Sequence, residues 1–438
     1  MTSLAALRSA PLPGGSCKRR TREPNPKPAN FVGPNRGGHL APGALDHRFL
    51  LHLPQPGGSP PPLLLPLMAE VLSAPAVAAP SIFEQIEQHH HEQVVFCHDE
   101  ETGLRAIIGI HNTVLGPSLG GTRMWHYTTD ADALHDVLRL SRGMTYKASI
   151  SGLNLGGGKA VILGDAKTMK TPALLRRFGQ FVDSLGGRYI TAEDVGINTA
   201  DMAQVRHETK HVTGLPAEMG GSGDPSPVTA YTTYLGMKAG AKTAFGSDSL
   251  AGKRVAVQGA GHVGIHLIER LLADGAQVFI SDYYAERVAA ITKQHPEVKA
   301  VGLDEIYDLD VDIYAPCALG ATLNDDTIPR LKAAVVAGCA NNQLADERLH
   351  GPQLVERGIY YAPDFLINAG GLINVYSELH GYNRDQAYAQ AERIYDQTLD
   401  IFRYCAAQGT HPQQAAIQIA EERIAQARAA AAPTPVVL

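Results

Sequence analysis

One stretch of the chain, residues 254–282, restricts the possible folds more than any other. An apolar run over 254–258 is followed by the turn Gly259-Ala260-Gly261-His262-Val263-Gly264, by a helical pattern up to Ala273, and by a second apolar run that ends at Asp282. A strand, a glycine turn, a helix and a strand in this order form the βαβ unit of a Rossmann domain. The sequence therefore predicts an α/β fold with a parallel sheet in its second half.

The glycine turn predicts a dinucleotide site. Gly259 permits the tight turn, Gly261 lets the backbone approach a pyrophosphate, and Gly264 allows close packing of helix on sheet. The free N–H groups at the start of the helix attract the phosphates. The expected cofactor-binding residues of this turn are Gly259, Ala260, Gly261, His262, Val263 and Gly264. A glycine-rich turn without a ligand is the alternative.

Asp282 predicts which dinucleotide is bound. It stands 21 residues after Gly261 at the end of the second strand. A carboxylate at this place accepts hydrogen bonds from the ribose hydroxyls and repels a 2′-phosphate. NAD is therefore expected rather than NADP, although Arg287 is close enough in sequence to keep NADP as an alternative.

The remaining chain divides into further parts. Its 438 residues exceed what one hydrophobic core supports. Residues 1–67 hold thirteen of the 28 prolines and eight basic residues against two acidic ones, which predicts a disordered or spurious N-terminal extension, with a linker or a targeting segment as alternatives. In 80–222 short β-rich runs alternate with amphipathic helices, which predicts an α/β substrate and oligomerisation domain.

A glycine- and proline-rich segment, residues 220–227, marks the predicted boundary between the two domains. Residues 223–383 are then the Rossmann NAD-binding domain, with a cleft between the two. A final helical stretch over 384–430 is expected to pack back on the first domain.

Composition narrows the kinds of partner. The net charge of -6 and the lack of a long basic run in the globular part disfavour nucleic acid and anionic membranes, so a small molecule is the expected ligand. Five cysteines without a C-x-x-C pair fit neither a disulfide framework nor a zinc site, and they predict a cytoplasmic protein. His89-His90-His91 is interpreted as a solvated helix face; metal binding there is the weaker alternative, and no metal site is predicted.

Four segments of the first half carry candidate catalytic groups. They are Gly120-Gly121-Thr122-Arg123-Met124, residues 142–147 ending in Lys147, residues 154–159 ending in Gly-Gly-Gly-Lys159, and residues 191–196, which contain Asp194. A lysine directly after three glycines is unusual. A phosphate-binding loop is disfavoured, because the spacing differs from G-x-x-x-x-G-K-[ST] and Ala160 replaces the hydroxyl. A buried ion pair that serves only the fold is the alternative for Lys147 and Asp194.

These four segments, followed by the Rossmann unit, resemble the glutamate/leucine/phenylalanine/valine dehydrogenases from about residue 81 to 426. The resemblance also includes residues 225–230, 315–320, 341–344 and 368–371. It implies the reversible, NAD-dependent oxidative deamination of an L-amino acid to a 2-oxo acid and ammonium, and a homo-oligomer, with an octamer favoured. A non-catalytic NAD-binding regulatory protein is the rival from another class.

The resemblance also implies roles for individual residues. Lys147 would hold the substrate carboxylate, and Lys159 would act as the general base on the water that attacks the iminium after the hydride has left Cα for the nicotinamide. Asp194 would shuttle protons to and from the amine. Two ammonium groups in a water-poor cleft repel each other, so one lysine should have a lowered pKa. Thr229 and Asn342 would contact cofactor and substrate.

The expected substrate side chain is apolar. Glutamate-specific relatives carry a lysine just before the Gly-Gly pair and a serine in a later helix, where this chain has Leu119 and Val375. A buried glutamate side chain would then lack a partner, at a cost of several kcal/mol. The other expected substrate-binding residues are Gly120, Gly121, Met144, Ala192 and Leu372. Leucine is the first choice, valine the second and phenylalanine the third. All three stay open, because one methylene discriminates between substrates by only ~1–3 kcal/mol.

Overall fold

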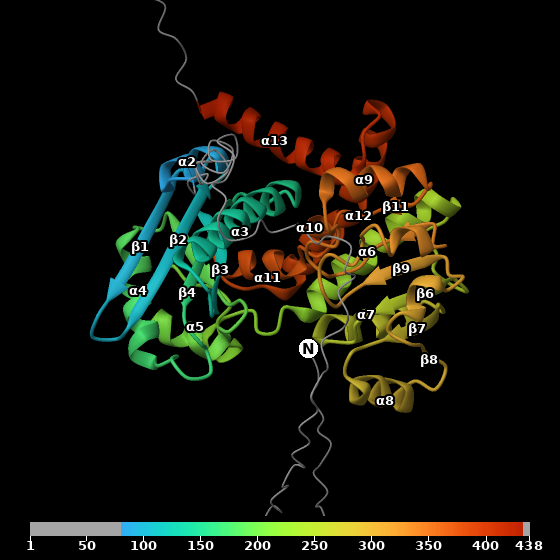
Figure 1. Cartoon of the computed structure of the whole chain (residues 1–438), viewed down its shortest axis with the longest axis horizontal. Helices are drawn as coiled ribbons and strands as arrows, with labels where there is room; N and C mark the ends of the chain where they lie inside the picture. Colours follow the sequence, from blue (N-terminus) through green and yellow to red (C-terminus); the bar gives the residue numbers. More distant parts are fainter. Residues whose placement is uncertain (1–79, 432–438) are drawn as a thin grey trace, which may run out of the picture. The chain divides into compact units, whose positions relative to one another are not determined.

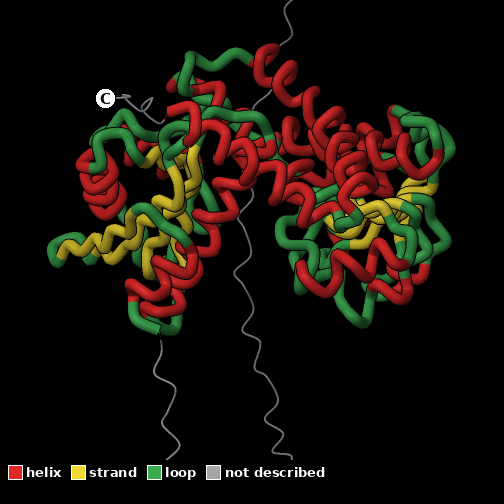
Figure 2. The backbone as a smooth tube through the Cα atoms, turned by 90° about the horizontal axis from the view of Figure 1, so that it is seen from above, coloured by secondary structure: helices red, strands yellow, loops and turns green. Residues whose placement is uncertain are grey.

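The computed structural model describes residues 80–431, which contain two β-sheets with helices packed on them (Figure 1). The prediction for residues 1–67 lies outside the described residues. Figure 2 shows the strands gathered in two groups, each with helices beside it. Among the described residues, no helix has the length and apolar character needed to cross a membrane.

The first sheet has the strand order β1-β2-β4-β3-β5. Strand β2 is antiparallel to β1 and β4, whereas β3 is parallel to β4 and β5. The strands are β1 (Gln93–Asp99), β2 (Leu104–Asn112), β3 (Ser118–Trp125), β4 (Gly156–Leu163) and β5 (Tyr189–Ala192). The helices of this half are α2 (Ile82–His89), α3 (Asp130–Ile150), α4 (Pro172–Ser184) and α5 (Thr199–Arg206), followed by the 3₁₀ turn η1 (Ala217–Met219).

Alternate residues of β2 pack on opposite faces of this sheet, as the two-residue period of a strand requires. Ile107 belongs to a buried cluster with Val137 of α3, and Ile108 belongs to another with Phe178 of α4. Helix α3 begins at a capping box between Thr129 and Asp132. It ends at Ile150 and so carries Lys147 in its last turn.

The three glycines before Lys159 lie in strand β4, and each allows the close approach of a neighbouring element. A Cβ on Gly157 would lie 2.1 Å from the backbone nitrogen of Thr145, and one on Gly156 would overlap the carbonyl oxygen of Asn112. A Cβ on Gly158 would lie 2.7 Å from the ring of Tyr189. The glycine run is therefore needed for packing around Lys159.

The variant Gly157→Ala is expected to destabilise the protein by about 2–3 kcal/mol, because its Cβ meets backbone atoms of α3 that cannot move alone. Urea unfolding measures the change. Gly143→Ala on α3 is the matched control. No atom lies within 4 Å of the Cβ position of residue 143, so the free energy of unfolding of this variant should equal or exceed that of the parent. Equal stabilities for the two variants would contradict the packing argument.

The second sheet is entirely parallel, in the order β11-β10-β9-β6-β7-β8. Read from β8, this is the 3-2-1-4-5-6 order of the Rossmann fold, which confirms the predicted fold class. The strands are β6 (Arg254–Gln258), β7 (Gln277–Ser281), β8 (Lys299–Ala300), β9 (Ile313–Pro316), β10 (Val335–Val336) and β11 (Tyr360–Tyr361). The helical elements are α6 (Ser226–Phe245), α7 (His262–Ala273), α8 (Ala285–Gln294), η2 (Glu305–Asp308), η3 (Ile328–Arg330), α9 (Glu347–Glu356), α10 (Asp364–Ile367) and α11 (Gly370–Glu378).

The C-terminal stretch predicted as one helical unit forms two helices, α12 (Arg384–Gln408) and α13 (Pro412–Ala431). Gly409 ends α12 with φ 65°, and Pro412 begins α13, which are the usual residues for these two positions. Helix α12 packs along α6, whereas α13 packs on α3. Arg423 of α13 donates to the carbonyl oxygens of Ser149 and Leu153, at the end of the helix that carries Lys147.

The interpretation of His89-His90-His91 as a solvated face is wrong for His91. Its side chain is buried, and Nε2 lies 2.6 Å from the Ser141 hydroxyl of α3. Burial lowers the pKa of His91 to about 4, and the neighbouring His89 adds to this effect. The ring also packs against His111, with ring centroids 4.8 Å apart. Among residues 80–431, no group of three or more metal-binding side chains could hold an ion.

Candidate active site

Lys159, Asp194 and Arg123 form a charged cluster in the first half of the chain. Lys159 Nζ lies 2.7 Å from Asp194 Oδ2, and Arg123 Nε lies 3.1 Å from the same oxygen. Arg123 also donates to Asp136 at 2.9 Å. Burial alone would raise the pKa of Asp194, but the positive charges of Lys159 and Arg123 outweigh it and hold this pKa below its ordinary value. Asp194 is therefore an ionised carboxylate.

The strand order explains why these three side chains meet. Lys159 lies on β4, Arg123 on β3, and Asp194 two residues after the end of β5, with β3 parallel to both of its neighbours. Glycine is required at position 121, because a Cβ there would lie 2.3 Å from the Glu193 carbonyl oxygen and 2.9 Å from the Asp194 side chain. Gly120 has a separate role: its Cβ position is filled by the Gly158 carbonyl oxygen, so it lets β3 and β4 approach.

Lys147 reaches the same region from helix α3. Burial lowers the pKa of Lys147 to about 8; Lys159 adds to this lowering, whereas Asp364 and Asp194 oppose it. One lysine of the pair thus has the lowered pKa expected from the sequence. The lowering falls on Lys147, for which the resemblance implies carboxylate binding.

Twelve of the predicted site residues line one cavity of about 710 Å³, a volume suited to a small ligand. They are Leu119, Gly121, Met144, Lys147, Lys159, Ala192, Asp194, Thr229, Val263, Asn342, Leu372 and Val375. The predicted residues outside its lining are Gly120, Gly259, Ala260, Gly261, His262, Gly264 and Asp282. The cavity joins charged groups to an apolar wall, since Leu119 and Leu372 are buried members of one hydrophobic core and Val375 packs against that core.

The predicted dinucleotide residues form a turn whose shape fits a pyrophosphate. Gly259 has φ 105°, and a Cβ there would lie 2.7 Å from the Ala318 nitrogen. A Cβ on Gly264 would lie 2.3 Å from the Gly259 carbonyl oxygen, so both glycines are required. Gly261 begins α7 without a side-chain cap, and its Cβ position is open apart from Arg287 at 3.9 Å. The first N–H groups of α7 can therefore receive phosphate oxygens.

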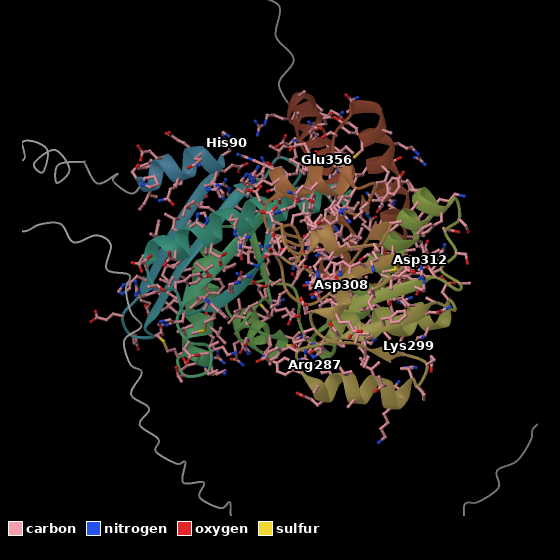
Figure 3. The ribbon with its side chains drawn as sticks, turned by 45° about the vertical axis from the view of Figure 1, so that its right-hand side comes forward. His90, Arg287, Lys299, Asp308, Asp312 and Glu356 are labelled. Carbon is pink, nitrogen blue, oxygen red and sulfur yellow. The ribbon has the colours of Figure 1, made fainter. Side chains whose placement is uncertain are left out.

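Asp282 stands at the end of β7, where a ribose would be recognised. Its Oδ2 accepts a hydrogen bond from Ala260 N at 2.7 Å and its Oδ1 one from Tyr284 N at 2.8 Å. Arg287 of α8, labelled in Figure 3, places Nη1 3.6 Å from Asp282 Oδ2 and is about half exposed. A carboxylate and a guanidinium therefore share the ribose end of the site.

The sequence did not predict several charged residues of the site, among them Arg123 and Asp364, which line the cavity, and Asp136, which accepts from Arg123. Arg123 stood in a segment singled out for its glycines, and the two-residue period from Gly121 would have placed it on the same face. Asp364 lies just after β11 in the second half, and it lines the cavity with its Oδ2 accepting from Gln343 N at 2.9 Å. No local pattern connects Asp364 with Lys147.

A Rossmann sheet beside a cavity with two lysines and an ionised aspartate defines a dinucleotide-dependent dehydrogenase that acts on a small charged substrate. Two family models match the chain. They are the Glu/Leu/Phe/Val dehydrogenase dimerisation domain over residues 91–211 and the Glutamate/Leucine/Phenylalanine/Valine dehydrogenase model over residues 280–432. The chain belongs to the glutamate/leucine/phenylalanine/valine dehydrogenase family, and it is therefore an amino-acid dehydrogenase that uses a nicotinamide cofactor.

Individual relatives support this membership and confirm the resemblance found in the sequence. The chain is 53% identical to a leucine dehydrogenase of Geobacillus stearothermophilus over 80% of this chain and 95% of the relative. It is 49% identical to a valine dehydrogenase of Streptomyces coelicolor over 82% and 99%. Among solved structures, L-tryptophan dehydrogenase from Nostoc punctiforme matches with a TM-score of 0.72 and 45% identity, covering 80% of this chain and all of that one.

Proposed function

We propose that this chain catalyses the NAD-dependent oxidative deamination of branched-chain L-amino acids, with L-leucine favoured. The observation that carries the proposal is the cavity that holds Lys147, Lys159 and Asp194 together with an apolar wall of Leu119, Leu372 and Val375. The charged groups suit the carboxylate and amine shared by all amino acids, and the apolar wall suits an aliphatic side chain. The 53% identity to a leucine dehydrogenase supports the same choice.

The substrate carboxylate binds to Lys147. This ammonium is partly buried, so its pairing with a carboxylate restores the favourable interaction that burial removed and raises its lowered pKa. Gly121 and Met144 complete the lining beside it, and Ala192 adds to the apolar side. The nicotinamide cofactor, when bound, accepts the hydride from the substrate Cα.

Lys159 and Asp194 carry out the proton transfers. Lys159 is the proposed general base, which takes a proton from the water that attacks the imine carbon. Asp194, 2.7 Å from Lys159 Nζ, hands protons to and from the departing amine, and Arg123 keeps this carboxylate in place.

The residues of the glycine turn are proposed to hold NAD, with Asp282 on the ribose. Thr229, Val263 and Asn342 line the cavity from the second half of the chain, so they are placed to contact both the cofactor and the substrate. We propose the domain limits 80–222, together with 384–430, for the substrate domain and 223–383 for the NAD-binding domain. The packing of α13 on α3 supports this assignment for the last helix.

A substrate panel tests the proposal. The full chain is assayed for NADH formation with L-leucine, L-valine, L-isoleucine, L-phenylalanine and L-glutamate, each with NAD⁺ and NADP⁺. The highest kcat/KM is expected for L-leucine, with L-valine next. A clear preference for L-valine or L-phenylalanine would identify that amino acid, and not L-leucine, as the substrate. No turnover with any of the five amino acids would support a non-catalytic dinucleotide-binding protein.

A homo-oligomer, with an octamer favoured, is proposed from the family resemblance, and the match to a dimerisation-domain model over residues 91–211 supports self-association. A cytoplasmic location is proposed because the four described cysteines are free thiols, as expected in a reducing compartment.

The variant Asp282→Asn is expected to lower the NAD-to-NADP preference in kcat/KM by about 100-fold, or ~2.8 kcal/mol. The amide keeps an acceptor for the Ala260 N–H but removes the charge that repels a 2′-phosphate, while Arg287 remains to pair with the phosphate. Kinetics with both cofactors measure the change. In the control Arg287→Ala, NADP should become a poorer substrate still; an unchanged preference in Asp282→Asn would refute the assigned role.

A further inference from the structure

Two thiols, Cys317 and Cys339, lie side by side at the carboxyl end of the second sheet. Strands β9 and β10 are paired in parallel up to Tyr314 and Val336, and each cysteine follows three residues later. Backbone hydrogen bonds continue past the strand ends, from Ala337 N to the Tyr314 oxygen and from Ala340 N to the Pro316 oxygen. Cys339 Sγ lies 3.9 Å from the carbonyl oxygen of Cys317.

The parallel register of β9 and β10 is compatible with a disulfide between the residues that follow the two strand ends. Neighbouring strands lie ~4.8 Å apart, and a disulfide joins Cα atoms that are ~4.4–6.8 Å apart. The proximity of Cys317 and burial hold the pKa of Cys339 well above its ordinary value. The contact that the geometry shows is the one from Cys339 Sγ to the Cys317 carbonyl oxygen, which places the two cysteines next to each other.

Cys317 is in contact with the glycine turn. Its backbone N donates to the Gln258 oxygen at 2.7 Å, directly before Gly259, and a Cβ on Gly259 would lie 2.8 Å from the Cys317 carbonyl carbon. Cys339 lines the cavity together with Asn342, and its carbonyl oxygen accepts from Asn368 at 3.1 Å. A covalent bond between the two sulfurs would pull on both walls of the dinucleotide site.

We propose that Cys317 and Cys339 are an oxidation site, in which a peroxide converts the two thiols to a disulfide that weakens dinucleotide binding. The effect on binding rests on the proposed function, whereas the disulfide itself does not. No role in hydride or proton transfer is assigned to either cysteine.

The chemistry balances with hydrogen peroxide as the two-electron oxidant. Cys339 keeps its proton, so the Cys317 sulfur attacks the peroxide; an S–O bond forms, the O–O bond breaks, and hydroxide leaves with the thiol proton as water. The Cys339 sulfur then attacks the sulfenic acid of Cys317. An S–S bond forms, the S–O bond breaks, and the hydroxide takes the Cys339 proton to leave as a second water.

The test treats the reduced full chain with hydrogen peroxide, alkylates the remaining thiols and maps them by mass spectrometry. A peptide pair joined through Cys317 and Cys339, about 2 Da lighter than its reduced parts, is expected, and dithiothreitol should separate it. NADH binding, followed by NADH fluorescence, should weaken about tenfold on oxidation and recover on reduction.

Two variants sharpen the test, each compared with its own reduced form. Cys339→Ser should form no such pair and show no reversible loss of NADH affinity. Cys405→Ser, whose cysteine is also partly buried but lies on α12, should still form the pair and respond as the parent does. Disulfides between other cysteines, or oxidation of Cys317 without Cys339, would contradict the proposed oxidation site. A Cys317–Cys339 disulfide that leaves the NADH affinity unchanged would contradict the proposed effect on binding. A reduced protein that binds no NADH would instead contradict the proposed cofactor.

Discussion

Replacing Lys159 with alanine is expected to lower kcat for the deamination of L-leucine by about 10³-fold, because a positioned general base contributes 10²–10⁴ in rate. The fold should survive the change. Asp194 keeps its second cationic partner, since Arg123 Nε lies 3.1 Å away, so the variant does not leave a buried carboxylate without a charge. The rate of NADH formation under saturating substrates measures the loss.

A readout specific for a missing base separates catalysis from packing. The space left by the lysine side chain lies on the cavity, so added methylamine should restore part of the rate of Lys159→Ala. The matched control is Arg177→Ala, which breaks an ion pair of similar length, 2.9 Å, with Asp99 outside this cavity. Its kcat should stay within about twofold of the parent, as for most changes away from the reacting groups. Full turnover of Lys159→Ala would refute the assigned base.

The part of the site that local sequence predicted is the glycine turn. Its strand, turn, helix and strand lie within residues 254–282, and Gly264 contacts the turn itself, whereas the partner of Gly259 is the segment that follows β9. The break between α12 and α13 also had a local signal, because Gly409 and Pro412 are typical end and start residues that periodicity alone overlooked.

The contacts within the charged cluster of Lys159, Asp194 and Arg123 could not be predicted without the tertiary structure. Lys159 and Asp194 meet only because β3 lies between β4 and β5, a strand order that the sequence does not encode locally. The sequence therefore suggested both residues without showing that they form one ion pair with Arg123. His91 is similar: its burial depends on Ser141 and His111, which come from other elements.

Replacing Lys147 with methionine is expected to reduce kcat/KM for the amino acid by about 10²–10³-fold, mainly through KM. Truncating one partner of a buried charge pair costs ~2–5 kcal/mol, and here the substrate carboxylate would lose its cationic partner. The KM for NAD⁺ should change little, because Lys147 lies on α3 in the first half of the chain. Initial rates with each substrate varied in turn measure both constants.

The lowered pKa of Lys147 predicts a pH dependence that tests the same role. With the pKa at about 8, the free enzyme loses this positive charge as the pH rises, so kcat/KM for the 2-oxo acid should fall above about pH 8. The 2-oxo acid is the better probe, because its carboxylate stays ionised throughout, and ammonium is kept saturating at each pH.

Asp364 makes this prediction specific to Lys147. Its negative charge opposes the lowering of the Lys147 pKa, so Asp364→Asn should move the alkaline limb of the profile to lower pH by about one unit. The single amide oxygen can still accept from one of the two backbone N–H groups, Gln343 N or Phe365 N, and thermal unfolding of Asp364→Asn checks that the fold is kept. An alkaline limb that stays in place in Asp364→Asn, together with an undiminished kcat/KM in Lys147→Met, would show that the substrate carboxylate binds elsewhere in the cavity.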